Sequence, residues 1–194
     1  MQPARLPLLI RQGTTLNETL RLMQPRRVYK PITSIIAGAP VRVVVPGHGL
    51  AGTWPVWFSG VVGLPALNRD IASARPHRAD VIDADTLEIN AIDATDSRPS
   101  GGRLVYSPPV DLTGVRARLQ VRATVESPAV LLELTTDDGI TLDGPGLVRR
   151  HLSAERTAAQ RWTRGVYDLE LTFPDGTVSR WIEGEALVVQ EVTR

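Results

Sequence analysis

In Val115-Arg-Ala-Arg-Leu-Gln-Val-Arg-Ala123, apolar and polar side chains alternate without a break, and this segment is the clearest indication of the fold. Successive side chains of a β-strand point to opposite faces of the sheet, so this alternation predicts a strand with one buried and one solvated face. Arg116, Arg118 and Arg122 lie on the solvated face. The stretch therefore indicates an antiparallel sheet that packs on one side only.

Further strands are predicted on both sides of this stretch. The period of two recurs from Thr15 to Leu22 and from Tyr167 to Phe173. Short apolar or β-branched runs between turn residues add Ile35–Ile36, Val41–Val45, Trp54–Val62, Val81–Ile82, Leu87–Ile89, Ala129–Thr135, Ile140–Leu142, Val178–Ile182 and Glu185–Val192. Only Ser153 to Arg161 has the N-cap and charge pattern of a helix. We therefore expect a mainly β protein, a sandwich or barrel of roughly nine or ten strands with one short helix.

Composition excludes several classes of protein. The chain has 194 residues with 22 Lys plus Arg, 21 Asp plus Glu and a net charge of +1, so nothing in it predicts binding to nucleic acid. No apolar run approaches the roughly 18 residues that cross a bilayer, and Arg11 interrupts the N-terminal apolar residues before they reach signal-peptide length. The absence of cysteine excludes disulfides, thiolate nucleophiles and Cys-ligated metals. We expect no membrane insertion and no Sec-dependent export.

Two stretches have the composition of connections. Pro and Arg are frequent from Met23 to Pro40, without a clear period, which makes this stretch a candidate domain boundary. Residues 96–102 are rich in Ser, Pro and Gly and are typical of a linker.

Residues 33–96 resemble a known module. The resemblance is carried, in order, by Pro46-Gly-His-Gly-Leu-Ala-Gly52, Val56-Trp-Phe-Ser-Gly-Val-Val-Gly-Leu64, Leu67-Asn68 and Val81-Ile-Asp-Ala-Asp-Thr-Leu-Glu-Ile89. These pieces are similar to a module of bacteriophage tail proteins, itself similar to the first catalytic-cysteine half-domain of ubiquitin-activating enzymes. The resemblance implies a small β-barrel-like module. It does not imply ubiquitin chemistry, since the chain has neither a cysteine for a thioester nor a Gly-x-Gly-x-x-Gly motif for an adenylate. The stretch from Arg69 to Arg78 departs from the usual pattern and is expected to be a loop.

The flanks resemble a different family. Ile10-Arg-Gln-Gly-Thr-Thr-Leu16, Val110-Asp-Leu-Thr-Gly-Val-Arg-Ala-Arg-Leu-Gln-Val-Arg122 and residues 165–180, with Glu191-Val-Thr-Arg194, look like the small β-sandwich of phage baseplate and tail-tip proteins. The N-terminal domain of siphophage upper baseplate proteins is one relative. We therefore expect a discontinuous host sandwich, residues 1–32 and 103–194, that carries the inserted module at 33–102. Such an insertion is tolerated because the entropy cost of loop closure grows slowly with length.

No catalytic, cofactor-binding or metal-binding residue is predicted. His48, His77 and His151 lie far apart without ligand spacing, and His48 between two glycines is expected to hydrogen-bond the backbone in a turn. Asp83, Asp85, Asp93 and Asp96 lack the pattern of a calcium loop, and Asp85 is expected in a hairpin turn. Ser59 has no Gly-x-Ser-x-Gly frame around it.

Two groups of residues are candidates for a protein interface. Trp54, Trp57 and Phe58 occupy both parities of one strand, so they cannot all face one core. Either they form the core and its lid, or one face of the strand docks on a neighbouring subunit, where aromatic anchors are frequent. The row of Arg116, Arg118 and Arg122 is either a solvated face or a surface that forms ion pairs with a partner.

The resemblance implies a non-enzymatic structural protein of a phage tail, an adaptor at the baseplate or tail tip. Its partners would be other tail or baseplate proteins and further copies of itself, as a trimer or hexamer. It would lie in the virion tail after assembly in the host cytoplasm. A receptor- or carbohydrate-binding role of the module, a capsid-decorating role and, least favoured, a cell-wall hydrolase are the alternatives.

Overall fold

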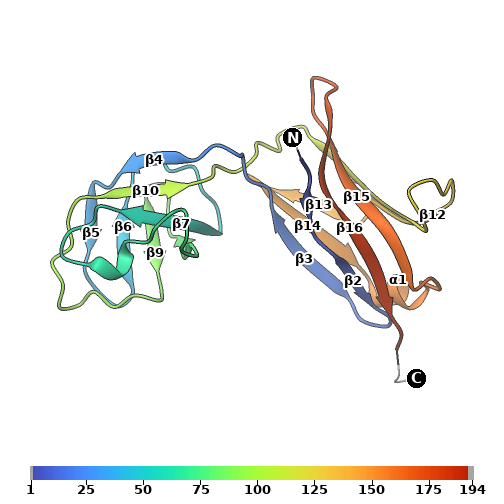
Figure 1. The fold of residues 1–194 in the computed structure, drawn as a ribbon, viewed down its shortest axis with the longest axis horizontal. Coiled ribbons are helices and arrows are strands. Elements are labelled where there is room, and N and C mark those ends of the chain that lie inside the picture. Colours follow the sequence, from blue (N-terminus) through green and yellow to red (C-terminus); the bar gives the residue numbers. More distant parts are fainter. Residues whose placement is uncertain (1, 192–194) are drawn as a thin grey trace. The chain divides into compact units, whose positions relative to one another are not determined.

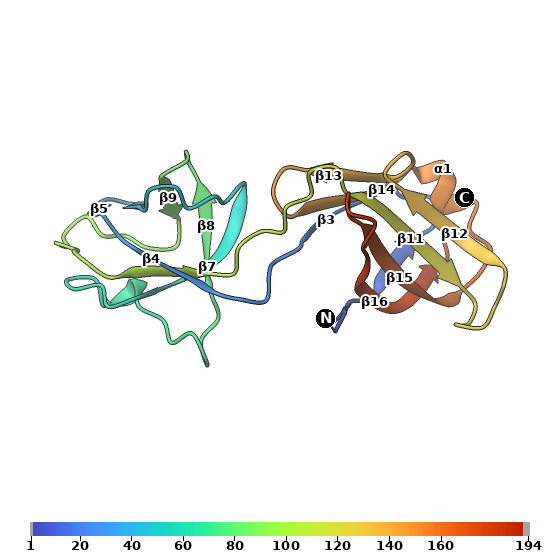
Figure 2. The same cartoon turned by 90° about the horizontal axis from the view of Figure 1, so that it is seen from above.

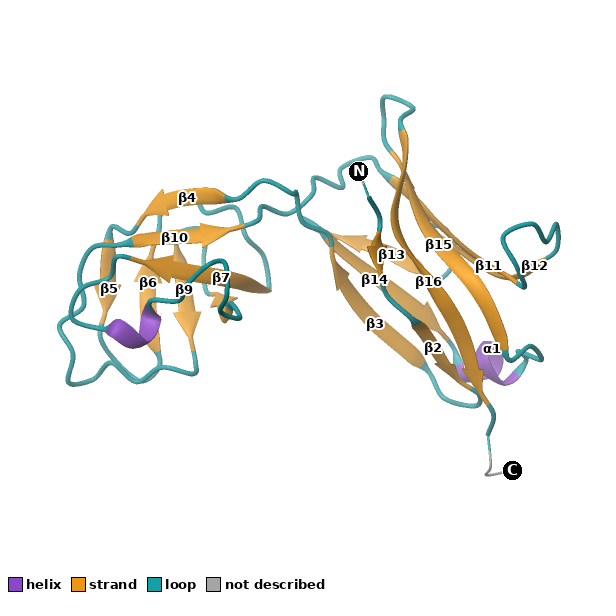
Figure 3. Cartoon of the chain, viewed as in Figure 1, coloured by secondary structure: helices purple, strands orange, loops and turns teal. Residues whose placement is uncertain are grey.

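A computed structural model describes residues 2–191 of the chain (Figure 1). Strands dominate, and the helical structure consists of α1 (Ala154–Ala158) and a short 3-10 turn (Pro65–Leu67) (Figure 3). The expected mainly β class with one short helix is confirmed. Helix α1 begins after the predicted N-cap, since the Ser153 hydroxyl accepts a hydrogen bond from the Arg156 amide at 3.2 Å. It ends earlier than predicted, at Ala158 rather than Arg161.

The chain divides into two compact units, each with its own core. The host unit consists of Met1–Leu22 and Asp111–Arg194, and the inserted unit is Met23–Val110. The expected boundaries at 32/33 and 102/103 are therefore displaced. The reason is that β4 (Val28–Pro31) pairs with β10 (Arg103–Tyr106), and β10 pairs in turn with β7 (Thr53–Ser59). Residues 23–32 and 103–110 thus belong to the inserted unit.

The host unit is a sandwich of two sheets, which Figure 2 shows as two layers. In the six-stranded sheet, β11 (Arg116–Arg122) lies between β12 and β15, as the predicted alternation requires, with Ala117, Leu119 and Val121 buried. The other strands of this sheet are β1 (Ala4–Arg5), β2 (Leu8–Arg11), β12 (Val130–Thr135), β15 (Arg164–Thr172) and β16 (Val178–Val189). The three-stranded sheet contains β3 (Leu16–Arg21), β13 (Ile140–Asp143) and β14 (Leu147–Leu152).

The last strand, β16, differs from the prediction. Two strands were expected, Val178–Ile182 and Glu185–Val192, but one continuous strand spans Gly184 and ends at Val189. The glycine does not mark a turn. A Cβ at Gly184 would clash with the carbonyl oxygen of Leu6, so the glycine permits the N-terminal segment to lie against β16. The end of the predicted strand, Val192, lies outside the described residues.

The first residues of the chain form part of the six-stranded sheet. β1 and β2 pair in parallel with β16, with Arg5 opposite Glu183 and Leu8 opposite Ala186. Leu8 and Ile10 are fully buried. Because parallel pairing needs a long connection between the strands, no local pattern in the sequence indicated it.

An ion pair between a buried arginine and a partly exposed glutamate joins two strands of the host unit. Arg150 of β14 and Glu18 of β3 are directly opposite in register and form a salt bridge, and the Arg150 side chain is 1% exposed. The Arg150 guanidinium also lies over the Tyr167 ring, 5.7 Å from its centre, and one of its N–H groups donates to the Tyr167 hydroxyl at 3.4 Å. The hydroxyl donates to the carbonyl of Leu6 at 2.8 Å. This network links the two sheets to the N-terminal segment.

The inserted unit is one curled antiparallel sheet. Its seven strands follow the order β4, β10, β7, β8 (His77–Val81), β9 (Thr86–Ile89), β6 (Val41–Val44) and β5 (Ser34–Ile36). The two edge strands, β4 and β5, are consecutive in the chain. Between them, the Ile32 amide donates to Gly102 at 3.1 Å and the Thr33 amide donates to Val44 at 2.9 Å. The chain from 28 to 36 therefore passes from one edge to the other, which gives the sheet a barrel-like curl of the kind that the resemblance implies.

Removing the carboxylate of Glu18 is expected to destabilise the host unit strongly. Glu18→Ala leaves the buried Arg150 charge without its partner, so we expect the free energy of unfolding to fall by about 3 kcal/mol in urea titrations. Arg150→Met removes the charge, keeps the volume and costs less. The control is Asp143→Ala, which breaks the solvent-facing pair with Arg149 and costs less than about 1 kcal/mol. Equal losses from Glu18→Ala and Asp143→Ala would contradict the prediction.

Candidate functional site

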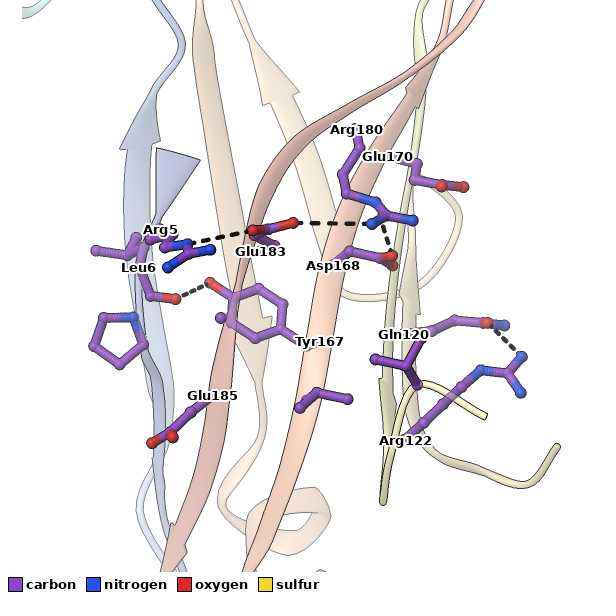
Figure 4. A pocket seen from close by; sticks show the side chains of 14 residues that line it. Arg5, Leu6, Gln120, Arg122, Tyr167, Asp168, Glu170, Arg180, Glu183 and Glu185 are labelled. Atoms are coloured by element: carbon purple, nitrogen blue, oxygen red, sulfur yellow. Dashed lines mark hydrogen bonds and ion pairs between the residues drawn. The ribbon is translucent and has the colours of Figure 1, made fainter. Parts of the chain in front are cut away.

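An open groove of about 700 Å³ lies on the outer face of the six-stranded sheet of the host unit (Figure 4). Strands β15 and β16 form its floor. One wall is the N-terminal segment with Leu6 and Pro7, and the other includes β11 and the loop after it, where Val125 is 80% exposed. We call this feature the outer-face groove. Its volume is typical of a cleft that holds a ligand or a partner's side chains.

A chain of ion pairs crosses the groove. Arg5 lies 3.4 Å from Glu183, Glu183 lies 3.8 Å from Arg180, and Arg180 lies 3.1 Å from Asp168 (Figure 4). The residues come from three adjacent strands, and cross-strand register places Glu183 opposite both Arg5 and Asp168. The side chains are partly exposed, so each pair contributes little to stability. Their effect is to hold the charged groups of the floor in place.

The opposite end of the groove is mainly apolar. Leu6, Pro7, Val125 and Val166 line it, and Glu185 lies beside them on β16. Tyr167 is buried beneath this end, and burial raises the pKa of its hydroxyl. The hydroxyl therefore stays protonated and can donate its hydrogen bond to Leu6, which holds the N-terminal wall against the sheet. The groove thus joins an apolar end to a charged end.

The arginine row predicted from the sequence lies on the same outer face, and each member has partners within the chain. Arg116 pairs with Asp137 at 3.0 Å, and Arg118 pairs with Glu133 at 2.7 Å. The hydrogen bond from Arg118 lowers the pKa of the Glu133 carboxyl. Of the three, Arg122 alone lines the groove.

Arg122 closes the loop that forms one wall of the groove. Its guanidinium donates to the carbonyls of Ser127 at 2.7 Å and Pro128 at 2.9 Å, and to the Gln120 side chain at 2.9 Å. Val125 lies within the loop that these bonds hold together. The role of Arg122 in the structure is therefore to position the wall.

The three aromatic residues proposed for an interface, Trp54, Trp57 and Phe58, lie on opposite faces of β7. Trp54 and Phe58 point into the core of the inserted unit and are fully buried. The Trp54 indole donates to the Ser107 carbonyl at 3.0 Å, and the Phe58 ring lies 5.8 Å from the His77 ring. An interface role is therefore wrong for Trp54 and Phe58, because neither reaches the surface. The physical reason is that both belong to the inward parity of β7, together with Val56.

Trp57 lies on the outward parity of β7 and is half-buried. The Arg27 guanidinium lies 5.1 Å from the centre of its ring, within the range of a cation–π contact, and its indole donates to the Ala74 carbonyl at 2.9 Å. Across the sheet, Val105 lies in register between Trp57 and Tyr29, and Tyr29 is 54% exposed. Arg103, two residues before Val105 in β10, lies on the same face of the sheet. We call Arg27, Tyr29, Trp57, Arg103 and Val105 the arginine–aromatic patch.

The histidines do not come together. His48 and His77 are both buried in the inserted unit, and His151 is exposed in the host unit. His48 Nδ1 accepts a hydrogen bond from the Leu50 amide at 3.1 Å, so the expected backbone contact in a turn is confirmed. His77 Nε2 lies 2.9 Å from the Leu67 carbonyl. Desolvation by burial lowers the pKa of both rings.

The predicted acidic turn residues act locally. The Asp83 carboxylate accepts from the Asp85 amide at 2.8 Å, and the Asp85 carboxylate accepts from the Gly47 amide at 2.7 Å. The Asp93 carboxylate accepts from the amide and hydroxyl of Thr95. Among residues 2–191, no three His, Asp or Glu side chains cluster as metal ligands would. Ser59 lies at the end of β7.

Several residues of the two surfaces escaped the sequence analysis. In β15, the outward parity carries Asp168 and Glu170 opposite the polar parity of β11, and this alternation was a usable signal for a charged outer face. Arg5 and Leu6 gave no such signal, because they reach the groove only through the parallel pairing of β1. Tyr29 and Arg27 lay in a stretch without a period.

Acidification is expected to destabilise the inserted unit through His48 and His77. The unfolded chain binds protons near the ordinary histidine pKa of about 6.5, whereas the folded unit binds them only at lower pH. Their contribution to stability is therefore complete above about pH 6.5 and is lost as the pH falls below it. Native-state hydrogen exchange with mass spectrometry, which reports each unit separately, should show weaker protection of the inserted unit at about pH 5 than at about pH 7.5.

The matched variants are His48→Asn and His77→Gln. Asn can accept the Leu50 bond, Gln can donate to Leu67, and neither titrates in this range. The double variant should show a flatter pH dependence. His151→Gln in the host unit is the control and should leave the inserted unit's dependence unchanged. If protection of the inserted unit in the double variant falls with pH as steeply as in the wild type, the two histidines are not the cause of the acid sensitivity.

The chain was compared with known protein families and with curated proteins. No family model matches it, and no curated protein matches its sequence. Within residues 2–191, no helix has the length and apolar character needed to cross a membrane.

Proposed function

We propose that this chain is a structural component of a bacteriophage tail, an adaptor at the baseplate or tail tip that works through contacts between subunits. The proposal draws on the resemblance of the flanks and of residues 33–96 to tail modules described above. It assigns no chemistry to the chain, since assembly requires complementary surfaces rather than reacting groups.

The observation that carries the proposal is the way in which the host unit bears a second folded unit. The chain leaves the host unit at Leu22 and returns at Asp111, and the two connecting segments are paired. The Gln24 amide donates to Pro108 at 2.8 Å, and Met23 forms a bridge with Pro109. Two units with separate cores can each bind a different neighbour. This property suits an adaptor.

Symmetry would supply the strength of such an assembly. A contact of modest area is repeated by every subunit of a closed ring, and a subunit already held by one contact makes its next one at high effective concentration. A trimer or hexamer is the order that the resemblance implies. The exposed surfaces described above, the outer-face groove and the arginine–aromatic patch, provide the polar and aromatic character of protein interfaces.

The test is the location of the chain in virions of the phage that encodes it. A specific antibody, detected with gold particles in the electron microscope, should label the distal end of the tail. Label over the head would indicate a capsid-decorating protein, and the absence of label from intact virions would indicate a role outside the particle. Either result would overturn the proposal.

A receptor- or carbohydrate-binding role makes a different prediction. Purified protein would bind to the surface of host cells, and excess protein would block adsorption of the phage. We expect neither effect for an adaptor whose surfaces are occupied by other tail subunits. Blocked adsorption together with loss of the effect in Tyr29→Ala would transfer the function to the inserted unit.

A further inference from the structure

The outer-face groove has a negative surplus. Four carboxylates, Asp168, Glu170, Glu183 and Glu185, and three guanidinium groups line it. Asp168 and Glu183 are paired with Arg180. Within the described part of the chain, Glu170 and Glu185 form no ion pair, and they lie toward the two ends of the floor (Figure 4). The groove therefore presents one unpaired acid toward each end of its floor, and Glu185 is the one beside the apolar end.

The arginine–aromatic patch of the inserted unit has the opposite character. Tyr29 is more than half exposed although it is a large aromatic side chain. Arg27 and Arg103 are exposed, and neither forms an ion pair with any residue between 2 and 191. Val105 is fully buried between the two aromatic residues, so the patch has a packed apolar centre and a cationic rim. Tyr, Trp and Arg are the residues that dominate binding at protein interfaces.

We propose that the outer-face groove of one copy of this chain binds the arginine–aromatic patch of a second copy. Tyr29 enters the apolar end of the groove, against Leu6 and Val125, and Arg27 and Arg103 meet the carboxylates of Glu170 and Glu185. Charge complementarity identifies the partner, because the patch carries two guanidinium groups without ion pairs, whereas the groove carries two such carboxylates and a net negative charge. This self-contact rests on the assembly role proposed above, and the partner in that assembly is a second copy of the chain.

The contact has a consequence for symmetry. The groove and the patch are different surfaces on different units of the same chain, so a copy that uses its groove on one neighbour still presents its patch to another. Such a contact closes in a pair when the groove and the patch of each copy both meet those of the other. Otherwise it propagates into rings when the rotation closes and into open chains when it does not. A ring of a baseplate is one outcome of this geometry.

The first measurement is the mass of the full-length protein by sedimentation equilibrium across the micromolar range. We expect association, into a reciprocal dimer or a larger assembly, that weakens as salt is raised. Arg27→Glu with Arg103→Glu should weaken association at least about tenfold, and Glu170→Arg with Glu185→Arg should do the same. Arg98→Glu, a single charge reversal at an exposed residue outside the patch, is the control and should change little. Circular dichroism checks that each variant is folded.

The decisive variant carries all four reversals in one chain. If the groove of one copy meets the patch of another, the exchanged charges attract again and association returns toward that of the wild type. No recovery overturns the proposal. Weakening by the groove variant but not by the patch variant also overturns it, since the groove would then bind something else.

The two proposals can fail separately. Label at the tail tip with a protein that stays monomeric overturns the self-contact and leaves the adaptor role standing. If association depends on both surfaces but no label is found on the virion, the self-contact stands and the adaptor role is overturned.

Discussion

Backbone pairing between two distant pieces of chain holds the host unit together. The first piece contributes β2 and β3, which pair with β16 and β14 of the second. Leu8 and Ile10 fill the core between the sheets, and Tyr167 reaches the Leu6 carbonyl from beneath. Since the insertion separates the two pieces in sequence, these contacts replace the short connections that normally bring strands together. Without them there is neither a sandwich nor a groove.

The same constraint shapes the surface. Because the N-terminal segment lies beside β16, Arg5 and Leu6 become the wall of a groove whose floor belongs to strands near the other end of the chain. Gly184 makes the close approach possible, and the buried Arg150, paired with the partly exposed Glu18, contacts Tyr167 beneath the same region. A buried charge contributes little net stability but is costly to unpair, which favours one arrangement of these strands over others.

The sheet of the inserted unit has two edge strands that follow each other directly in the chain. Its edge strands, β4 and β5, are one continuous stretch of chain that hydrogen-bonds at both edges of the sheet. These edge strands are only four and three residues long and offer little free backbone to a partner strand, which favours assembly through side-chain contacts. The exposed Tyr29 and the unpaired Arg27 and Arg103 supply such side chains on one face.

The class of fold, the central strand β11, most of the other strands and the cap of α1 could be predicted from the sequence alone. The reason is that a period of two and a capping residue act over a few neighbouring positions. The sequence also separated the aromatic parities of β7, although not which one was buried. Tertiary structure alone decided the edges of the inserted unit, the parallel strands β1 and β2, the continuous β16 and the buried Arg150. Each of these depends on a partner far away in the chain: Val28–Pro31 becomes a strand because Arg103–Tyr106 lies beside it, and Arg150 is tolerated in the core because Glu18 is opposite. Local sequence patterns predict which face of a strand is exposed to solvent, but they do not predict which strand pairs with it.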